Sequence, residues 1–227
     1  MQKLKLDSST IDNILESLLK RSPSQYTEYE NTVNEIIANV RENGDKAIFE
    51  YTKKFDKADI NASNIIVTEE EIDEAYTLVS DELIDVIKKS LVNVKAYHEK
   101  QRQNSWFTSE EGIILGQKVT PLDKVGVYVP GGKAVYPSSV LMNVVPAKVA
   151  GVPNIYMTTP CNSEGKVNPS TLVAAHEAGV DVIYKCGGAQ AIAALAFGTE
   201  SITKVDKIVG PGNIFVALAK KAVFGHV

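Results

Sequence analysis

The chain has 227 residues, of which 44% are hydrophobic and 23% charged, and its formal net charge is -4 at pH 7. A surface that follows nucleic-acid phosphates needs clustered Lys and Arg, so this acidic balance argues against a nucleic-acid partner. No uncharged stretch is long enough for a membrane span, no secretory signal is recognisable, and the two cysteines lack metal-ligand spacing, so we expect a cytoplasmic protein with no membrane partner.

Charge and glycine content divide the chain into two regions. Residues 1–124 hold 16 basic and 23 acidic residues, whereas residues 125–227 hold 8 basic and 5 acidic residues and 12 of the 15 glycines. We therefore expect a mainly helical N-terminal region over residues 1–124, and a glycine-rich α/β domain over residues 125–227.

Two amphipathic helices are predicted first. Apolar residues three and four positions apart predict a helix with Ser9 and Asp12 as a capping pair, and these residues are Ile11, Ile14, Leu15, Leu18 and Leu19. The same spacing over residues 33–40 predicts a second helix, which we expect to end at Gly44.

Residues 64–67 are a candidate short strand, and a third helix is predicted directly after them. Thr68 and Glu71 have the spacing of a capping box, and the helix should continue to about Val79. We expect the acidic run 69–71 to be a solvated first turn.

A fourth helix is predicted around Ile87, Leu91 and Val94, and His98 continues its apolar stripe. We interpret His98 as a core or interface residue that is hydrogen-bonded at one ring nitrogen, because no carboxylate partner for catalysis is placed near it. The helices of this region therefore indicate a scaffold.

Residues 125–227 alternate between short apolar runs and helical patterns, which predicts a Rossmann-like open parallel sheet. The expected strands are 125–129, 154–158, 182–185 and 207–209, and the expected helices are 139–150, 169–178, 189–197 and 213–223. Pro146 falls inside the first of these helices and should kink it.

Glycine clusters follow three of the predicted strands, in VGVYVPGG, KCGGAQ and IVGPGN. Glycine lets the backbone approach a ligand closely, and the N-terminus of the following helix offers unpaired N–H groups to a phosphate. The pattern predicts a nucleotide pocket at these strand ends. The G-x-G-x-x-G fingerprint and the P-loop are both absent, so motif physics alone does not identify the chemistry.

Several multi-residue blocks resemble the histidinol dehydrogenase family. They are VGVYVPGGKAVYPSSVLMNVVPAKVAGV, DVIYKCGGAQAIAALAFGTE and VDKIVGPGNIFVALAKK, with VRENGDKAIFEYTKKFD and VKAYHEKQ upstream. The resemblance implies an aldehyde-dehydrogenase-like architecture and a homodimer that acts in histidine biosynthesis. It also implies NAD-dependent oxidation of L-histidinol through L-histidinal to L-histidine, with a bound zinc ion.

The resemblance assigns NAD contacts to Tyr128, Gln190 and Asn213 in this chain. Local chemistry agrees, because Tyr128 ends a strand and both amides lie at helix starts. The alternatives are a core tyrosine at position 128, a helix cap at 190, and a helix N-cap at 213 that also touches the ligand.

The family continues for about as many residues again beyond Val227, and the resemblance places its acid-base pair, zinc ligands and most substrate contacts there. We therefore assign no catalytic residue and no metal ligand in this chain, which we interpret as the N-terminal half of the enzyme, inactive alone. His98, His176 and His226 have no zinc-ligand spacing.

Two other functions remain open from the sequence. One is a nucleotide-binding module without catalysis. The other is a cysteine-dependent aldehyde dehydrogenase that uses Cys186, which follows a predicted strand directly before Gly187.

Overall fold

The computed structural model describes residue 11, residues 26–131 and residues 135–227. The predicted helix over residues 11–19, with its capping pair, therefore lies outside the described residues, apart from Ile11. The described helices are α2 (Thr27–Phe55), α3 (Glu69–Leu78), α4 (Asp81–Glu99), α5 (Pro137–Ala150), α6 (Pro169–Ala178), α7 (Gly188–Phe197) and α8 (Ile214–Ala222). The strands are β1 (Trp106–Glu110), β2 (Ile113–Gln117), β3 (Lys124–Tyr128), β4 (Asn154–Thr159), β5 (Val182–Lys185) and β6 (Lys207–Val209).

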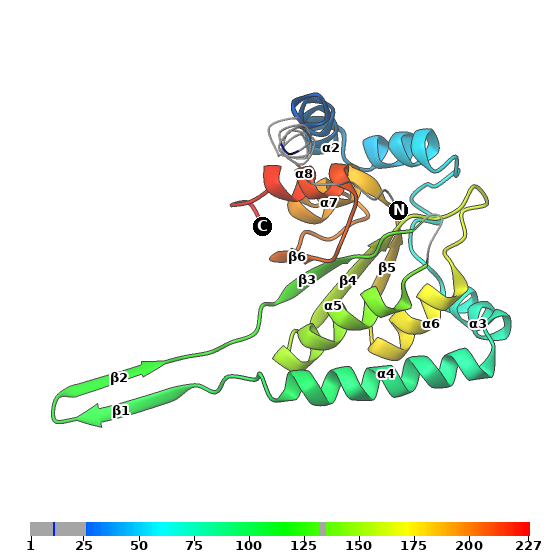
Figure 1. The fold of residues 1–227 in the computed structure, drawn as a ribbon. Helices are drawn as coiled ribbons and strands as arrows, with labels where there is room; N and C mark the ends of the chain where they lie inside the picture. Colours follow the sequence, from blue (N-terminus) through cyan, green and yellow to red (C-terminus); the bar gives the residue numbers. More distant parts are fainter. Residues whose placement is uncertain (1–10, 12–25, 132–134) are drawn as a thin grey trace.

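Strands β3 to β6 form a parallel sheet with the order β5-β4-β3-β6. Helices α5 and α6 cover one face of this sheet, and α7 and α8 cover the other (Figure 1). Helices α3 and α4 pack outside α5 and α6, while α2 packs outside α7 and α8. The helices of the first region thus pack on the outside of both helical layers, and one continuous apolar core joins these helices to the sheet region.

The prediction of a Rossmann-like parallel sheet is confirmed. All four predicted strands and all four predicted helices of residues 125–227 form, and their ends fall within two residues of the expected positions. Short apolar runs bounded by glycine give clear boundaries, since buried parallel strands need no polar alternation. Helix α5 continues through Pro146, and the kink there stays a prediction.

Helix α2 shows why Gly44 is a glycine. The residue has φ 52° and ψ -130°, so it interrupts the helix as predicted, but a second helical run continues to Phe55. Asp45 begins this second run and accepts hydrogen bonds from the backbone N–H and the hydroxyl of Ser201. The Asp45 N–H in turn donates to Glu200 at 2.8 Å, which joins α2 to the loop after α7.

The predicted strand over residues 64–67 is wrong, because this segment forms a single antiparallel bridge between Ile66 and Tyr184. The N–H of Val67 donates to the carbonyl of Ile183, and that of Lys185 donates to the carbonyl of Ile65. The segment runs along β5 only briefly because α3 starts at Glu69, two residues after Val67.

The capping box at the start of α3 is confirmed, with the Thr68 hydroxyl and the Glu71 carboxylate each accepting from the other residue's N–H. The prediction that all of residues 69–71 are solvated is wrong for Glu71. Its carboxylate pairs with the buried Lys185 ammonium at 2.6 Å. The partner lies 114 residues further along the chain, so local sequence could not reveal it.

His98 lies at the end of α4, where its Nδ1 is 2.6 Å from the side-chain oxygen of Gln101. The predicted hydrogen bond at one ring nitrogen is confirmed, since Nε2 is buried and has no partner among the described residues, but His98 is only half-buried and is not part of the apolar core. This contact does not create a catalytic pair.

A β-hairpin formed by β1 and β2 was not predicted. It projects away from the rest of the molecule (Figure 1), and every residue of both strands is exposed. Without one buried face the strands show no clear alternation of apolar and polar residues, so the usual strand signal is missing. Among the described residues, no helix is long and apolar enough to cross a membrane.

Candidate functional site

The strand order creates a switch point between β3 and β6. The chain passes from β3 to β4 and β5 on one side, and then crosses back through α7 to add β6 on the other side. Ligands of open parallel sheets bind at the carboxyl ends of the strands, in the crevice where the order reverses. The loops that follow Tyr128 and Val209 therefore border the expected binding crevice.

A cavity of about 450 Å³ lies at these strand ends. It is lined by Thr32, Ile36, Phe55, Asp56, Tyr128, Pro130, Gly131, Pro160, Cys161, Gly187, Gly188, Ala189, Gln190, Asn213 and Phe215. The structure thus brings Tyr128, Gln190 and Asn213 together in one cavity, although 85 residues of sequence separate the first from the last.

Tyr128 ends β3 and is buried. Its hydroxyl oxygen accepts a hydrogen bond from the N–H of Gly188 at 3.1 Å, which connects the end of β3 to the start of α7. Burial raises the pKa of Tyr128 to about 12, so the hydroxyl keeps its hydrogen at neutral pH and can donate it to a ligand. The residue is therefore both a core side chain and a wall of the cavity.

Gln190 lies in the first turn of α7 and is 1% exposed. The N-cap of this helix is Gly187, which provides no side-chain cap, so the helix-cap interpretation of Gln190 does not hold. The Oε1 atom of Gln190 is buried and has no hydrogen-bond partner among the described residues. An unpaired buried carbonyl oxygen is costly, and a ligand that donates a hydrogen bond would satisfy it.

Asn213 is the N-cap of α8, as expected, and its side-chain oxygen accepts from the N–H of Val216 at 3.1 Å. Its side chain faces the same cavity, and its amide NH₂ group keeps donor capacity for a ligand. The N-cap role and the contact role are compatible, as predicted.

Two glycines allow the cavity wall to close tightly around Pro160. A Cβ atom on Gly131 would lie 2.6 Å from the Pro160 ring, and one on Gly187 would lie 2.7 Å from it. The loops after β3, β4 and β5 can therefore meet only because these residues lack side chains. This close packing gives the cavity a backbone-lined wall, which suits a phosphate or ribose group.

Asp56 and Cys161 also line the cavity, and sequence reasoning assigned no role to either. Asp56 is the C-cap of α2, and burial raises the pKa of its carboxyl to about 6. Burial likewise raises the pKa of the Cys161 thiol to about 11. The motif KKFD contains Asp56, but only the packing of α2 against the sheet brings it to the strand ends.

The structure does not support the alternative that uses Cys186 as a nucleophile. The residue is completely buried and does not line the cavity. Burial raises the pKa of its thiol well above the ordinary value, which disfavours the reactive thiolate.

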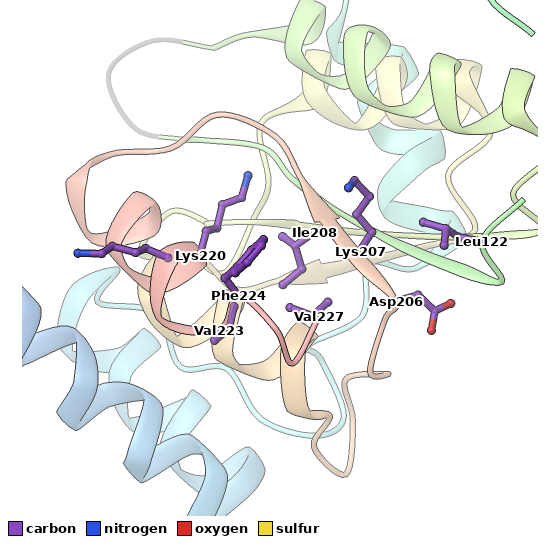
Figure 2. Close-up of a pocket in the computed structure, with 9 residues that line it drawn as sticks. Leu122, Asp206, Lys207, Ile208, Lys220, Val223, Phe224 and Val227 are labelled. Carbon is purple, nitrogen blue, oxygen red and sulfur yellow. The ribbon is translucent and has the colours of Figure 1, made fainter.

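A second cavity of about 600 Å³ lies beside β6 and the end of α8 (Figure 2). Ile208, Val223, Phe224 and Val227 gather at its centre in Figure 2. Its one carboxylate, Asp206, already accepts a hydrogen bond from the backbone N–H of Lys124 at 2.8 Å. This cavity offers apolar surface and lysines but no acid-base pair, so the cavity at the strand ends is the better candidate site.

Metal ligands are not gathered in the part of the chain that the structure describes. No group of three or more His, Cys, Asp or Glu side chains there is placed to hold an ion. The described residues thus do not fit a zinc site.

Comparisons with known proteins identify the family. The family described as histidinol dehydrogenase matches residues 19–227. The chain belongs to the histidinol dehydrogenase family. This result confirms the resemblance found in the sequence.

Individual relatives agree. Histidinol dehydrogenase of Clostridium acetobutylicum is 60% identical over 217 residues, which are 95% of this chain and 50% of that protein. The Bacillus subtilis enzyme is 56% identical, over 92% of this chain and 49% of its own length. The crystal structure of the Elizabethkingia anophelis enzyme superposes with a TM-score of 0.85 at 38% identity, and covers 99% of this chain and 51% of that one. The chain spans about half the length of the curated relatives it matches.

Proposed function

We propose that this chain forms the NAD-binding part of a histidinol dehydrogenase and that NAD binds in the cavity at the strand ends. The whole enzyme would oxidise L-histidinol through L-histidinal to L-histidine in histidine biosynthesis. Family membership supports the reaction, and the single observation that supports the binding site is the convergence of Tyr128, Gln190 and Asn213 on one cavity.

The donors and acceptors of this cavity fit a dinucleotide. The Gly188 N–H at the start of α7 donates to the Tyr128 hydroxyl, and the N-cap Gly187 provides no side-chain cap, so the other N–H groups of the first turn can bind a pyrophosphate oxygen. The Gln190 oxygen lacks a donor, and the Tyr128 hydroxyl and Asn213 amide can both donate. When bound, NAD would supply the hydride acceptor, and these residues would hold and orient it.

The test of this proposal is the substitution Gln190→Ala. Removing one neutral hydrogen bond should weaken NAD binding by about 0.5–1.5 kcal/mol, or roughly 2- to 13-fold. Calorimetric titration of the wild type and the variant measures the change. Alanine favours the helix and removes an unsatisfied buried oxygen, which offsets part of the cost of the cavity that it leaves, and circular dichroism checks that the fold is unchanged.

The matched control is Gln117→Ala in the exposed hairpin, which should leave NAD affinity unchanged. Equal NAD affinities for the wild type and Gln190→Ala would remove Gln190 from the site. No detectable NAD binding by the wild type would reject the proposal that this chain binds the cofactor.

Three further parts of the family's biology are proposed for the complete enzyme. Zinc would be held by residues other than those described, because the described residues do not fit such a site. We also propose a homodimer, and a cytoplasmic location that the two free cysteines support. The domain boundary near residue 124 remains part of the proposal, with residues 125–227 as the NAD-binding domain.

A further inference from the structure

Asp56 is a half-buried charged residue whose carboxylate has no evident role in the fold. Its Oδ2 atom is buried, and the described residues give it no hydrogen-bond partner and form no ion pair with either carboxylate oxygen. A partly buried carboxylate without a donor is costly. Other aspartates are used differently, since Asp45 and Asp181 accept from backbone N–H groups.

Its position in the fold adds to this cost. Asp56 caps the C-terminus of α2, where the backbone carbonyl groups make the local potential negative. A cation is favoured there, and Lys53 and Lys54 occupy the last turn. Neither helix stability nor core packing therefore explains a carboxylate at this position.

The cavity explains it better. Asp56 lines the same cavity as Gln190, Tyr128 and Asn213, and it is the only charged residue among the described lining residues. The titratable groups that interact electrostatically with it are Tyr128, Cys161 and Cys186, and each stays neutral at pH 7 because its pKa is raised. A ligand that carries hydroxyl donors would satisfy the carboxylate without a counter-charge.

We propose that Asp56 accepts hydrogen bonds from the adenosine ribose hydroxyls of the dinucleotide and makes the cavity select NAD over NADP. This inference rests on the proposed NAD site. The two oxygens of a carboxylate match the two neighbouring hydroxyls of a ribose, and an acidic side chain commonly has this role in dinucleotide folds.

The same residue explains why a 2′-phosphate would be excluded. NADP carries this extra dianion on the ribose that Asp56 would contact, and like charges placed together cost several kcal/mol. No Lys, Arg or His is found among the described lining residues to neutralise the phosphate. Selection against NADP thus follows from one repulsive contact, with no compensating cation among the lining residues that the structure describes.

The test compares three dinucleotides by calorimetric titration of the full 227-residue chain: NAD, NADP, and NAD that lacks the 2′-hydroxyl on the adenosine ribose. The wild type should bind NAD at least about 100-fold more tightly than NADP. Asp56→Asn should weaken NAD binding about 10-fold, which corresponds to about 1.4 kcal/mol. It should narrow the preference for NAD over NADP by about 10-fold or more, and should weaken binding of the deoxy analogue, which keeps only the 3′-hydroxyl, less than that of NAD.

The matched control is Asp59→Asn, which changes net charge equally three residues away. Its carboxylate is 87% exposed and forms only a surface ion pair with Lys53, so all three affinities should stay at wild-type values. Circular dichroism and thermal melting check the fold. Asp56→Asn should fold at least as stably as the wild type near neutral pH, and Asp56→Ala provides a second variant with the same expected loss of selectivity.

Two outcomes overturn the inference alone. The first is that the Asp56 variants prefer NAD over NADP as strongly as the wild type does, while Gln190→Ala still weakens NAD binding. The second is an equal loss for NAD and the deoxy analogue, which would indicate a structural effect. If the wild type binds none of the three dinucleotides, the proposed NAD site fails and this inference fails with it.

Discussion

At the scale of single residues, Gly44 joins two helical runs through a backbone conformation that other residues avoid. A Cβ there would also collide with the Glu200 carboxylate, which the Asp45 N–H holds in place. Gly44→Ala should therefore lower the free energy of unfolding by roughly 2–4 kcal/mol, from backbone strain and a disrupted hydrogen bond. Urea denaturation followed by circular dichroism measures the change.

Gly179→Ala is a comparison at a glycine with a less strained backbone and no tightly held neighbour. Gly179 has φ 81° and ψ 44°, and its Cβ would meet only the flexible end of Lys148. We expect a loss of about 1 kcal/mol from the left-handed backbone alone. A loss at Gly44 no larger than at Gly179 would contradict the extra cost assigned to its backbone conformation and its contact with Glu200.

Asp56 gives a prediction about pH. Its carboxyl pKa is raised from 3.8 to about 6 by burial, so the folded state binds this proton more tightly than the unfolded chain. The contribution of the protonated Asp56 carboxyl to the free energy of unfolding is fully present below about pH 4 and is lost as pH rises through 6. The free energy of unfolding of Asp56→Asn, relative to the wild type, should therefore be higher at pH 7 than at pH 4.

Chemical denaturation of both proteins across pH 4–7 measures this difference. The contributions of the other carboxylates to the pH dependence cancel, because these groups titrate in both proteins. Tyr128, Cys161 and Cys186 interact electrostatically with Asp56, but their pKa values, raised above ordinary values that already lie above this range, keep all three neutral throughout it. A difference in stability that does not vary with pH would mean that the Asp56 carboxyl titrates normally.

The sequence predicts some of these residues and misses others for a physical reason. Tyr128, Gln190 and Asn213 follow parallel strands, and parallel strands bring their carboxyl ends to one edge of a sheet. Asp56 ends a helix of the first region and reaches the cavity only because α2 packs over α7 and α8. Such tertiary placement leaves no local pattern.

At the scale of elements, α3 is attached to the sheet by the ion pair between Glu71 and Lys185. The Lys185 side chain is 6% exposed and that of Glu71 is 21% exposed, so removing one partner leaves a buried charge. Glu71→Gln should lower the free energy of unfolding by roughly 2–4 kcal/mol, somewhat less than for a fully buried pair. Thermal and urea denaturation measure it.

The same helix provides the comparison. Glu74 pairs with Lys166 at 2.6 Å, but both side chains are about half exposed. Glu74→Gln should therefore change stability by at most about 1 kcal/mol. Similar effects of the two substitutions would contradict the assignment of α3 anchoring to Glu71.

The elements that the sequence predicts well are those with one buried face or bounded apolar runs. The capping box at Thr68 and the strands β3 to β6 belong to this group. The hairpin β1–β2 does not, because none of its residues is buried. The sequence predicts a short strand over residues 64–67, yet this segment pairs with β5 at only one bridge.

At the scale of the whole molecule, the two regions differ in composition but are not separate in space. The acidic helices of the first region cover the outer faces of the glycine-rich sheet region, and α2 also contributes Phe55 and Asp56 to the cavity. The charge difference along the sequence therefore reflects exposure: the outer helices carry charge, and the inner helices such as α7 carry little.

The last prediction concerns binding without turnover. Asp56, Tyr128 and Cys161 are the titratable groups among the described lining residues of the cavity, and the last two keep their protons at neutral pH. In the proposed site Asp56 binds ribose, so none of the three is assigned to take a proton from histidinol. We therefore expect this chain to bind NAD yet produce no NADH when mixed with histidinol, with or without added zinc. Absorbance of NADH measures turnover, and a relative of full length provides the positive control. Steady NADH formation at a comparable rate would place the acid-base groups within these 227 residues and would overturn the division of labour proposed for the enzyme.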